Sequence, residues 1–279
     1  MRESPSPKAH LNALGLTAKR HFGQNFLADA SLCQKIADLC SEPGGSVIEL
    51  GAGLGALTRP LLAKAAHVTA VERDRDLVPA LRAEFEAEIA LGKLDVLEAD
   101  AKAIVPSELF AGKPRPHSLC GNLPYQITGP LLELAVRSAA QLDRAVFLVQ
   151  LEVALRLCAE PASADYGALT VFTRAAFDVQ RALVVRRGAF YPQPGVDSAV
   201  VVLSPRQNAV AETAIFRDLV HAAFQQRRKK LRNAWGSVLN LSSEALAELA
   251  RGAGVDLDRR GETLSVAEFA RMAELAEAK

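Results

Sequence analysis

Strand-like and helix-like segments alternate along the first half of this 279-residue chain, and this alternation limits the folds open to it. Apolar runs typical of buried strands are separated by segments whose apolar residues recur at helical spacing. Strands connected by helices in this way form a parallel sheet, because each helix carries the chain back to the starting edge. The expected strands are 46–50, 67–72, 94–99, 117–121 and 144–150, and the expected helices between them are 54–65, 74–89 and 128–140.

The pattern changes after residue 150. We expect two further helices and then two strands joined by a loop, at 152–159, 168–177, 179–186 and 198–203. The composition shifts around 205–208, and only helical spacing follows from Ala211 onward. Ser265 and Glu268 predict a capping box at the start of the last helix. The expected organisation is a flexible lead-in over 1–18, an α/β domain over 19–205 and a small all-helical domain over 209–279.

Glycine or polar residues stand at the ends of four expected strands. The first strand runs into a turn that contains Gly51 and Gly53, where the backbone turns tightly and a ligand approaches closely. Glu72 and Asp100 end the next two strands, and Asn122 ends the fourth. A single acid at a strand end is usually a solvated cap. Four such ends at one sheet edge favour a ligand site, because open α/β sheets bind ligands at the carboxyl ends of their strands.

The tetrapeptide Asn122-Leu123-Pro124-Tyr125 suggests what one ligand is. The Asn122 amide carbonyl is a hydrogen-bond acceptor. Pro124 favours an extended Leu123, which turns the Leu123 carbonyl out of the sheet, and Tyr125 offers a flat aromatic face. Two acceptors beside a ring fit a planar base with an exocyclic amine, such as adenine. The alternative for these four residues alone is an ordinary strand-to-helix turn.

The charged residues are balanced in number, with a formal net charge of +1, so a nucleic-acid partner has to be argued from their distribution. Residues 225–233 carry five positive charges and no negative one. We expect this run to form one basic helix, whose charges would repel one another without a polyanion nearby. Phosphate contacts by such a run supply affinity that does not depend on sequence. A solvated helix face is the alternative. The five residues are Arg227, Arg228, Lys229, Lys230 and Arg232.

Cysteine usage and hydropathy favour a cytoplasmic protein with reduced thiols. The four cysteines form no C-x-x-C pair, and Cys33 and Cys40 are spaced to share one buried helix face. The five histidines show no metal-ligand spacing, so no metal is expected. No apolar stretch is long enough to cross a membrane, and the amino terminus lacks the apolar segment of a signal peptide. We expect Trp235 in the core of the helical domain.

The chain resembles the ribosomal RNA small-subunit adenine N6,N6-dimethyltransferase family, whose members use S-adenosyl-L-methionine. The resemblance spans most of residues 19–240, in the order of the family's motifs. Two departures are Gln126, where many members have Asn, and Gly195, where many have Lys. The matching segments are G-Q-N-F-L at 23–27, E-L-G-A-G-L-G at 49–55, N-L-P-Y at 122–125, F-Y-P-Q-P-G-V-D-S-A-V at 190–200 and F-Q-Q-R-R-K-K-L-R-N at 224–233.

This resemblance implies a Rossmann-like class I methyltransferase fold. The sheet would be mostly parallel with a closing antiparallel strand, followed by the small helical domain. It also assigns the cofactor site by position. Asn25 and Leu27 would close over the methionine end, and Gly51 and Gly53 would approach the methionine portion. Glu72 would bind the ribose hydroxyls, Asp100 would accept from the adenine amine, and the Asn122 backbone would lie near the cofactor.

The chemistry expected is direct methyl transfer to the N6 amine of adenosine. The Asn122 side-chain carbonyl and the Leu123 backbone carbonyl would each accept one N6 hydrogen. Such positioning supplies much of the rate enhancement, and no tuned general base is required. The target base would be splayed out of its stack. Tyr125 would stack on one of its faces, and Phe190 is the candidate for the other.

The expected partner is small-subunit ribosomal RNA in a pre-ribosomal particle, bound by a monomer in the cytoplasm. The products would be two adjacent N6,N6-dimethyladenosines in the 3′-terminal hairpin loop. Three alternatives remain open: a DNA adenine methyltransferase, an antibiotic-resistance enzyme acting on large-subunit ribosomal RNA, and a non-catalytic nucleic-acid-binding relative. The short helical tail disfavours the first, the basic segment disfavours the second, and the intact N-L-P-Y and glycine turn disfavour the third.

Overall fold

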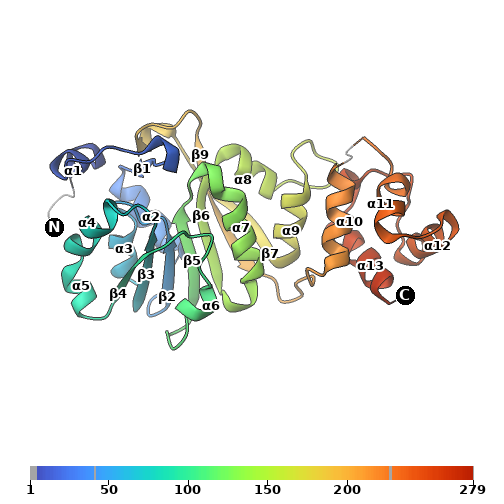
Figure 1. Ribbon diagram of the computed structural model, residues 1–279, viewed down its shortest axis with the longest axis horizontal. Coiled ribbons are helices and arrows are strands. Elements are labelled where there is room, and N and C mark those ends of the chain that lie inside the picture. The colour runs from blue at the N-terminus through green and yellow to red at the C-terminus, as the bar shows by residue number, and fades with distance from the viewer. Residues whose placement is uncertain (1–4, 41, 226–227, 279) are drawn as a thin grey trace. The chain divides into compact units, whose positions relative to one another are not determined.

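The computed structural model describes residues 5–40, 42–225 and 228–278, and its contacts divide the chain into two compact units. The first unit comprises Met1–Ala154 and Gln180–Pro205, and the second comprises Leu155–Val179 and Arg206–Lys279. Figure 1 labels the elements of both. The expected extent of the α/β domain, 19–205, is therefore wrong for residues 155–179, which associate with the helical unit.

The first unit is built on a seven-stranded sheet of order β4-β3-β2-β5-β6-β9-β7. The strands from β4 to β6 pair in parallel, and β9 pairs with β6 antiparallel. The Rossmann-like sheet with a closing antiparallel strand is thus confirmed. The chain leaves β2 toward β3 on one side and later returns to β5 on the other, so the carboxyl ends of β2 and β5 flank the switch point of the topology. The strands are β2 Ser46–Leu50, β3 His67–Glu72, β4 Leu94–Glu98, β5 His117–Asn122, β6 Arg144–Gln150, β7 Phe177–Val185 and β9 Ser198–Pro205.

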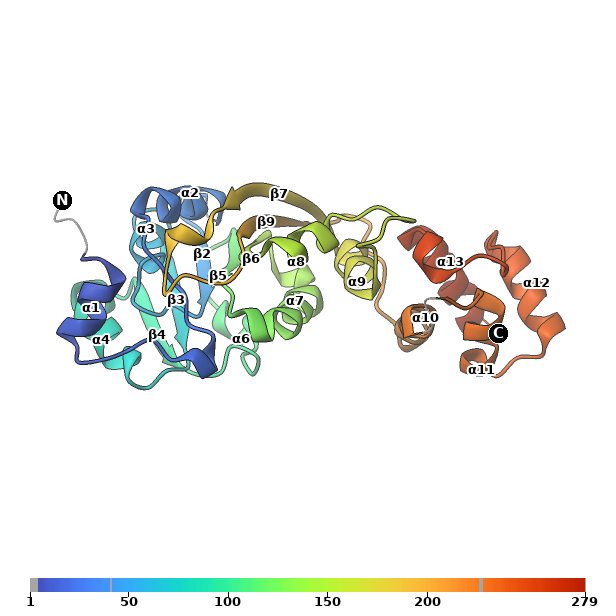
Figure 2. The same ribbon diagram turned by 90° about the horizontal axis from the view of Figure 1, so that it is seen from above.

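Helices cover both faces of this sheet, with α2 (Ala30–Cys40) and α3 (Thr58–Leu62) on one face and α6 (Pro106–Leu109) and α7 (Thr128–Arg137) on the other (Figure 2). The buried side chains of α2 recur at the spacing of one helix face. They include Cys33 and Cys40, which are free thiols in the core, as the sequence predicted.

Two expected helices are shorter than their periodicity suggested. The predicted helix 54–65 is reduced to α3, because Gly55 still has a left-handed φ of 80° and the turn extends past it. The predicted helix 74–89 is divided into α4 (Leu77–Glu84) and α5 (Glu86–Ala90). The break falls at Phe85, whose ring is buried against the turn at Gly55.

The amino-terminal segment is not the flexible lead-in that we expected. Within the described residues 5–18, a helix α1 spans Pro7–Ala13, with Ser6 as its N-cap and a proline in its first turn. Leu11 is only 2% exposed and packs in a small cluster with Phe26 and Leu77. Burial of Leu11 is what orders this segment, and hydropathy around a single leucine did not reveal it.

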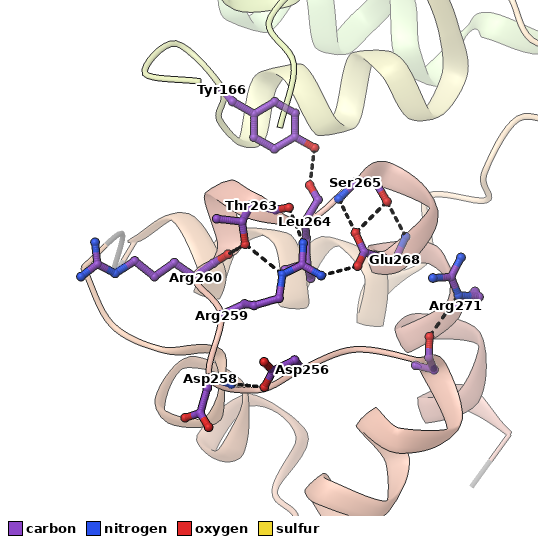
Figure 3. A network of polar contacts seen from close by, with 11 residues as sticks. Tyr166, Asp256, Asp258, Arg259, Arg260, Thr263, Leu264, Ser265, Glu268 and Arg271 are labelled. Carbon is purple, nitrogen blue, oxygen red and sulfur yellow. Dashed lines mark hydrogen bonds and ion pairs between the residues drawn. The ribbon is translucent and has the colours of Figure 1, made fainter. Parts of the chain in front are cut away.

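From Ala211 onward, the described residues of the second unit form helices and their connections and contain no strand, as predicted. Trp235 is fully buried in its core, and Ser265 and Glu268 form the predicted capping box (Figure 3). The Tyr166 hydroxyl donates a 2.8 Å hydrogen bond to the Leu264 carbonyl. That bond joins residues 155–179 to the carboxyl-terminal helices. The helices are α9 Ala168–Ala176, α10 Ala214–Gln225, α11 Leu231–Leu239, α12 Ser243–Ala253 and α13 Val266–Glu277, and α8 Leu151–Leu157 leads into this unit.

The described ranges contain no helix with both the length and the apolar composition needed to cross a bilayer. Within the same ranges, no three or more His, Cys, Asp or Glu side chains are grouped as metal ligands would be.

Candidate active site

One cavity in the first unit gathers the strand ends that the sequence singled out. It lies at the carboxyl ends of β2, β3, β4 and β5, beside the switch point between β2 and β5. The amino-terminal segment 21–27 contributes to its wall. The predicted site residues that line it are Asn25, Leu27, Gly51, Gly53, Glu72, Asp100, Asn122, Leu123, Pro124 and Tyr125.

The turn after β2 forms the floor of the cavity. Gly51 and Gly53 have left-handed φ angles of 75° and 57°, a conformation that costs a glycine little. A Cβ on Gly53 would lie only 3.1 Å from the Phe26 ring, so a larger residue would have to displace that ring. The Gly53 amide donates a 2.8 Å hydrogen bond to a Glu72 carboxylate oxygen. The glycine turn and Glu72 therefore form one rigid corner.

Glu72 is a buried acid, only 8% exposed, at the end of β3. One carboxylate oxygen accepts from the Gly53 amide, and the other accepts from the Asp74 amide at 2.8 Å. Burial raises the pKa of Glu72, and these backbone hydrogen bonds partly oppose the rise. A carboxylate offers about four lone-pair sites. Each oxygen therefore retains acceptor capacity for a hydroxyl group in the cavity.

Asp100 follows β4 and occupies another part of the cavity wall. Its Oδ1 accepts from the Lys102 amide at 3.0 Å. Its Oδ2 lies 3.3 Å from an Arg73 guanidinium nitrogen and 3.7 Å from the Lys102 ammonium. These contacts hold the half-buried carboxylate at the rim, where an amine hydrogen can reach it.

Asn122 and Leu123 place two acceptors at the end of β5. The Asn122 side-chain Nδ2 donates a 2.7 Å hydrogen bond to the Asn25 carbonyl, which orients the amide and leaves Oδ1 as the acceptor. The Leu123 amide donates to the Leu148 carbonyl at 3.0 Å. Among the described residues, none donates a hydrogen bond to Asn122 Oδ1 or to the Leu123 carbonyl. Both acceptors are open to a ligand in the cavity.

The structure brings Tyr125 to these acceptors and does not bring Phe190. The half-buried Tyr125 lines the cavity, and its hydroxyl lies 2.7 Å from the Ser198 Oγ at the start of β9. Phe190 is in β8 (Phe190–Tyr191), which pairs with β1 (Phe26–Leu27), and its ring is 4% exposed within the core. Phe190 is not among the residues that line the cavity, so it has no free face for a base here. The sequence placed Phe190 in a loop and missed this pairing.

The basic segment of the second unit is not one continuous helix, as its charge run suggested. Helix α10 ends at Gln225 and α11 begins at Leu231, so Arg228, Lys229 and Lys230 lie in the connection. Arg227 lies outside the described residues. Lys230 and Arg232 both contact the Asp258 carboxylate, at 3.0 and 2.7 Å. The self-repulsion expected from the run is therefore relieved in part within the unit.

The family of this chain follows from its similarity to known proteins. Residues 15–277 match the model of a family described as "Ribosomal RNA adenine dimethylase". The chain belongs to this family. Membership confirms the predicted family and, with the fold, the predicted class of enzyme, a methyltransferase that uses S-adenosylmethionine.

Relatives of this ribosomal RNA adenine dimethylase share nearly its whole length. A "Ribosomal RNA small subunit methyltransferase A" from Anaeromyxobacter sp. (strain K) is 46% identical, with 96% of each chain covered. A protein of the same name from Myxococcus xanthus (strain DK1622) is 42% identical, with 95% of this chain and 93% of the relative covered. A crystal structure of a dimethyladenosine transferase from Plasmodium falciparum has the same fold, with a TM-score of 0.77, 23% identity and coverage of 88% and 95%. The 23S rRNA methyltransferase ErmE is also similar, with a TM-score of 0.67, 26% identity and coverage of 91% and 100%.

The residues of this dimethylase fit the cofactor that its class requires. A buried carboxylate with unused lone pairs suits the two ribose hydroxyls. The glycine turn offers backbone without side chains, and Asp100 offers an acceptor for an adenine amine. These groups lie on neighbouring strand ends around one cavity, which is the arrangement a nucleoside with an amino-acid tail needs.

Sequence reasoning assigned no role to Glu49 in this dimethylase, although the residue lines the same cavity. Its carboxyl group is 2% exposed and accepts a 2.6 Å hydrogen bond from the Thr58 hydroxyl. Burial is the main cause that raises the pKa of Glu49 to about 8, and the nearby Glu72 charge adds to it. The signal was present in the sequence as a single acid inside an otherwise apolar strand.

Proposed function

We propose that this dimethylase transfers methyl groups from S-adenosylmethionine to N6 of two adjacent adenosines in the 3′-terminal hairpin loop of small-subunit ribosomal RNA. The products would be N6,N6-dimethyladenosines made during ribosome biogenesis. The proposal rests on two acceptors, Asn122 Oδ1 and the Leu123 carbonyl, to which no described residue donates a hydrogen bond. They lie with the Tyr125 ring in the cavity that would hold the cofactor. The names of the relatives support the small-subunit substrate.

The chain's own residues supply binding and orientation. Glu72 would hold the ribose of the cofactor, Asp100 would accept from its adenine amine, and the glycine turn would leave room for its methionine portion. When bound, S-adenosylmethionine supplies an electrophilic methyl group. The unpaired acceptors would fix the target amine, and Tyr125 would stack on the target base after it leaves its helix stack.

Two acceptors address the weak nucleophilicity of the adenine amine. Its nitrogen lone pair is delocalised into the ring. Hydrogen bonds from the two N6 hydrogens to Asn122 Oδ1 and the Leu123 carbonyl favour a pyramidal nitrogen with its lone pair directed at the methyl group. The nitrogen would form one N–C bond while the S–C bond to the transferred methyl group breaks and leaves its electron pair on the sulfur of S-adenosylhomocysteine. The proton that the nitrogen then loses is acidic enough to leave to water. Positioning of this kind is a large part of catalysis.

The basic segment would hold the RNA by its phosphates. Arg228 and Lys229 are exposed, and within the described residues they form no ion pair with an acidic side chain. Lys230 and Arg232 share Asp258, so they would contribute less. A phosphate contact by Arg227, which lies outside the described residues, stays part of the proposal. Such contacts position RNA without reading its sequence. We also propose that the protein acts as a monomer on a pre-ribosomal particle in the cytoplasm.

The test is methylation with labelled S-adenosylmethionine, with immature small subunits and large-subunit ribosomal RNA as parallel substrates. We expect label only on the small subunit, at two adjacent adenosines located by mapping. Asn122→Ala should abolish labelling while cofactor binding persists, because it removes one acceptor. Label on large-subunit RNA alone would instead favour the activity named for the similar 23S enzyme.

A further inference from the structure

The amino-terminal strap, residues 19–25, lines the cavity through residues 21–25 but belongs to no strand of the main sheet. It contains one turn of 3-10 helix, Arg20–Phe22, which ends at Gly23 with a left-handed φ of 65°. Inside the strap, the Lys19 amide donates to the Gln24 side-chain oxygen at 2.8 Å, and the Asn25 side chain donates to the Gly23 carbonyl at 3.0 Å. These local bonds shape the strap but do not attach it to the domain.

Asp74 attaches one end of the strap. Its Oδ1 lies 2.5 Å from the Lys19 ammonium, and its Oδ2 accepts a 2.7 Å hydrogen bond from the Gln24 side-chain Nε2. The Asp74 side chain is only 3% exposed. Although burial raises the pKa of the Asp74 carboxyl group, the bonds from Lys19 and Gln24 outweigh it, and the pKa lies below its ordinary value. A buried carboxylate with these two partners is a strong attachment.

The other end of the strap bears on the chemistry. The Asn25 carbonyl accepts the 2.7 Å hydrogen bond from Asn122 Nδ2. This bond decides which way the Asn122 amide faces, and hence where its Oδ1 points. An Asn122 amide without the Asn25 carbonyl has no such constraint, because the two ends of an amide are nearly the same size.

Asp74 also contacts, through its backbone, the part of the cavity expected to bind the cofactor. The Asp74 amide donates to Glu72, the acid that is expected to hold the ribose, at 2.8 Å. The loop that follows β3 therefore connects Glu72, Asp74 and the strap in one hydrogen-bonded chain.

We infer that Asp74 is a positioning residue: it holds the strap through Lys19 and Gln24, and the strap in turn holds the Asn122 amide toward the target amine. This inference rests on the proposed function for its effect on turnover. The attachment of the strap itself is independent of that function and is measured separately.

The first measurement is hydrogen exchange of the strap amides in the protein alone, without RNA or cofactor. Asp74→Asn should speed exchange in residues 19–25 by roughly ten- to a hundredfold, the loss expected for hydrogen bonds to a charged group. The second measurement is methylation of small subunits. The kcat of Asp74→Asn should fall about tenfold, since misplacement of a reacting group slows the chemical step. The KM of this variant for RNA should stay unchanged.

Arg75→Gln is the matched control, because it removes a charge from the same loop. Its side chain is 86% exposed and contacts Glu98 rather than the strap. We expect wild-type exchange and turnover from it. Lys19→Met, at a side chain 26% exposed, tests the attachment from the other side should Asp74→Asn not fold. It removes the contact with Asp74 and also the 2.5 Å contact of Lys19 with Asp76.

The double variant of Asp74 and Lys19 tests whether the two residues act through the same attachment of the strap. The fold-decrease in kcat of the double variant should be smaller than the product of the two single fold-decreases, because the effects of residues in one network are not additive. Unchanged strap exchange in both single variants, or losses that multiply fully, would overturn the inference. Failure of the wild type to methylate ribosomal RNA would refute the proposed function instead, and the exchange result would still decide the attachment.

Discussion

At the scale of single residues, each polar group in the cavity owes its role to what already occupies its other atoms. The Asn122 side-chain nitrogen donates to the Asn25 carbonyl, which leaves Oδ1 as an acceptor for a ligand. Glu72 accepts one backbone amide on each oxygen and retains acceptor capacity on both. The Tyr125 hydroxyl is used by Ser198, which leaves the ring face. The site is therefore organised before a ligand arrives.

Glu72→Ala should weaken S-adenosylmethionine binding by roughly ten- to a hundredfold. The reason is that the two ribose hydroxyls lose their charged acceptor, and a hydrogen bond to a charged group is worth about 1.5–3 kcal/mol. Titration calorimetry measures the dissociation constant directly. Glu98→Ala, an exposed acid that ends the neighbouring strand, is the control and should bind as the wild type does. An unchanged affinity in Glu72→Ala would remove its assignment to the ribose.

Tyr125→Ala should lower turnover on small subunits by roughly ten- to a hundredfold, because base–aromatic stacking is worth about 1–3 kcal/mol. Tyr125→Phe should be much milder. It keeps the ring and loses only the hydrogen bond to Ser198. Initial rates over a range of RNA concentrations separate the two variants, and unchanged cofactor affinity verifies that both are folded. Near-full turnover by Tyr125→Ala would exclude the stacking role.

At the scale of elements, the connection between α10 and α11 shows that a charge run is not a uniform surface. The sequence predicted one basic helix, whereas the structure ends α10 at Gln225 and uses Asp258 to pair Lys230 and Arg232. Helical spacing did not reveal the break. Asp258 is 26 positions beyond Arg232 in the chain, so only the fold brings them together.

Reversal of both Arg228 and Lys229 to Glu should weaken binding to pre-ribosomal particles and flatten its salt dependence. Each lost phosphate contact lowers the slope of log K against log salt by about 0.7–0.9. The control is the same reversal at Arg251 and Arg260, two other exposed arginines of this unit. A salt titration of particle binding, with cofactor binding in parallel, gives the slopes. Equal slopes for the wild type and the Arg228/Lys229 variant would mean that the connection is only solvated.

At the scale of the whole molecule, the chain does not divide where its composition changes. Residues 155–179 lead up to β7 and include its first residues, yet they belong with the helices of the second unit. Tyr166 bonds to Leu264, and Phe172 contacts the Phe216 ring. Local helical spacing in α9 is the same whether its apolar face meets a sheet or other helices, so the sequence could not assign it.

Buried Glu49 should make the stability of the first unit depend on pH. Its pKa is about 8 in the folded protein and 4.5 ordinarily. The folded state therefore keeps a proton that the unfolded chain loses, and stability falls as pH rises from about 4.5 to about 8. Glu49→Gln mimics the protonated acid and should lack this fall.

The measurement is urea unfolding at several pH values, followed by a brief thiol-labelling pulse at one fixed pH. Labelling of the buried Cys33, Cys40 and Cys120, resolved by mass spectrometry, reports the first unit. Trp235 fluorescence would report only the second. Glu98→Gln is the exposed control. The same pH dependence in Glu49→Gln and the wild type would contradict this account.

The sequence by itself determined the parallel α/β sheet and the residues that meet at its carboxyl edge. Those features follow from signals carried by a few neighbouring residues: apolar periodicity, glycine turns and the polar residues at strand ends. The tertiary structure alone decided that Phe190 is buried, that Leu11 orders a helix, that Asp258 pairs the basic residues and that Asp74 holds the strap. Each of these depends on residues far apart in the chain, and burial or pairing between such residues leaves no periodic trace in the sequence.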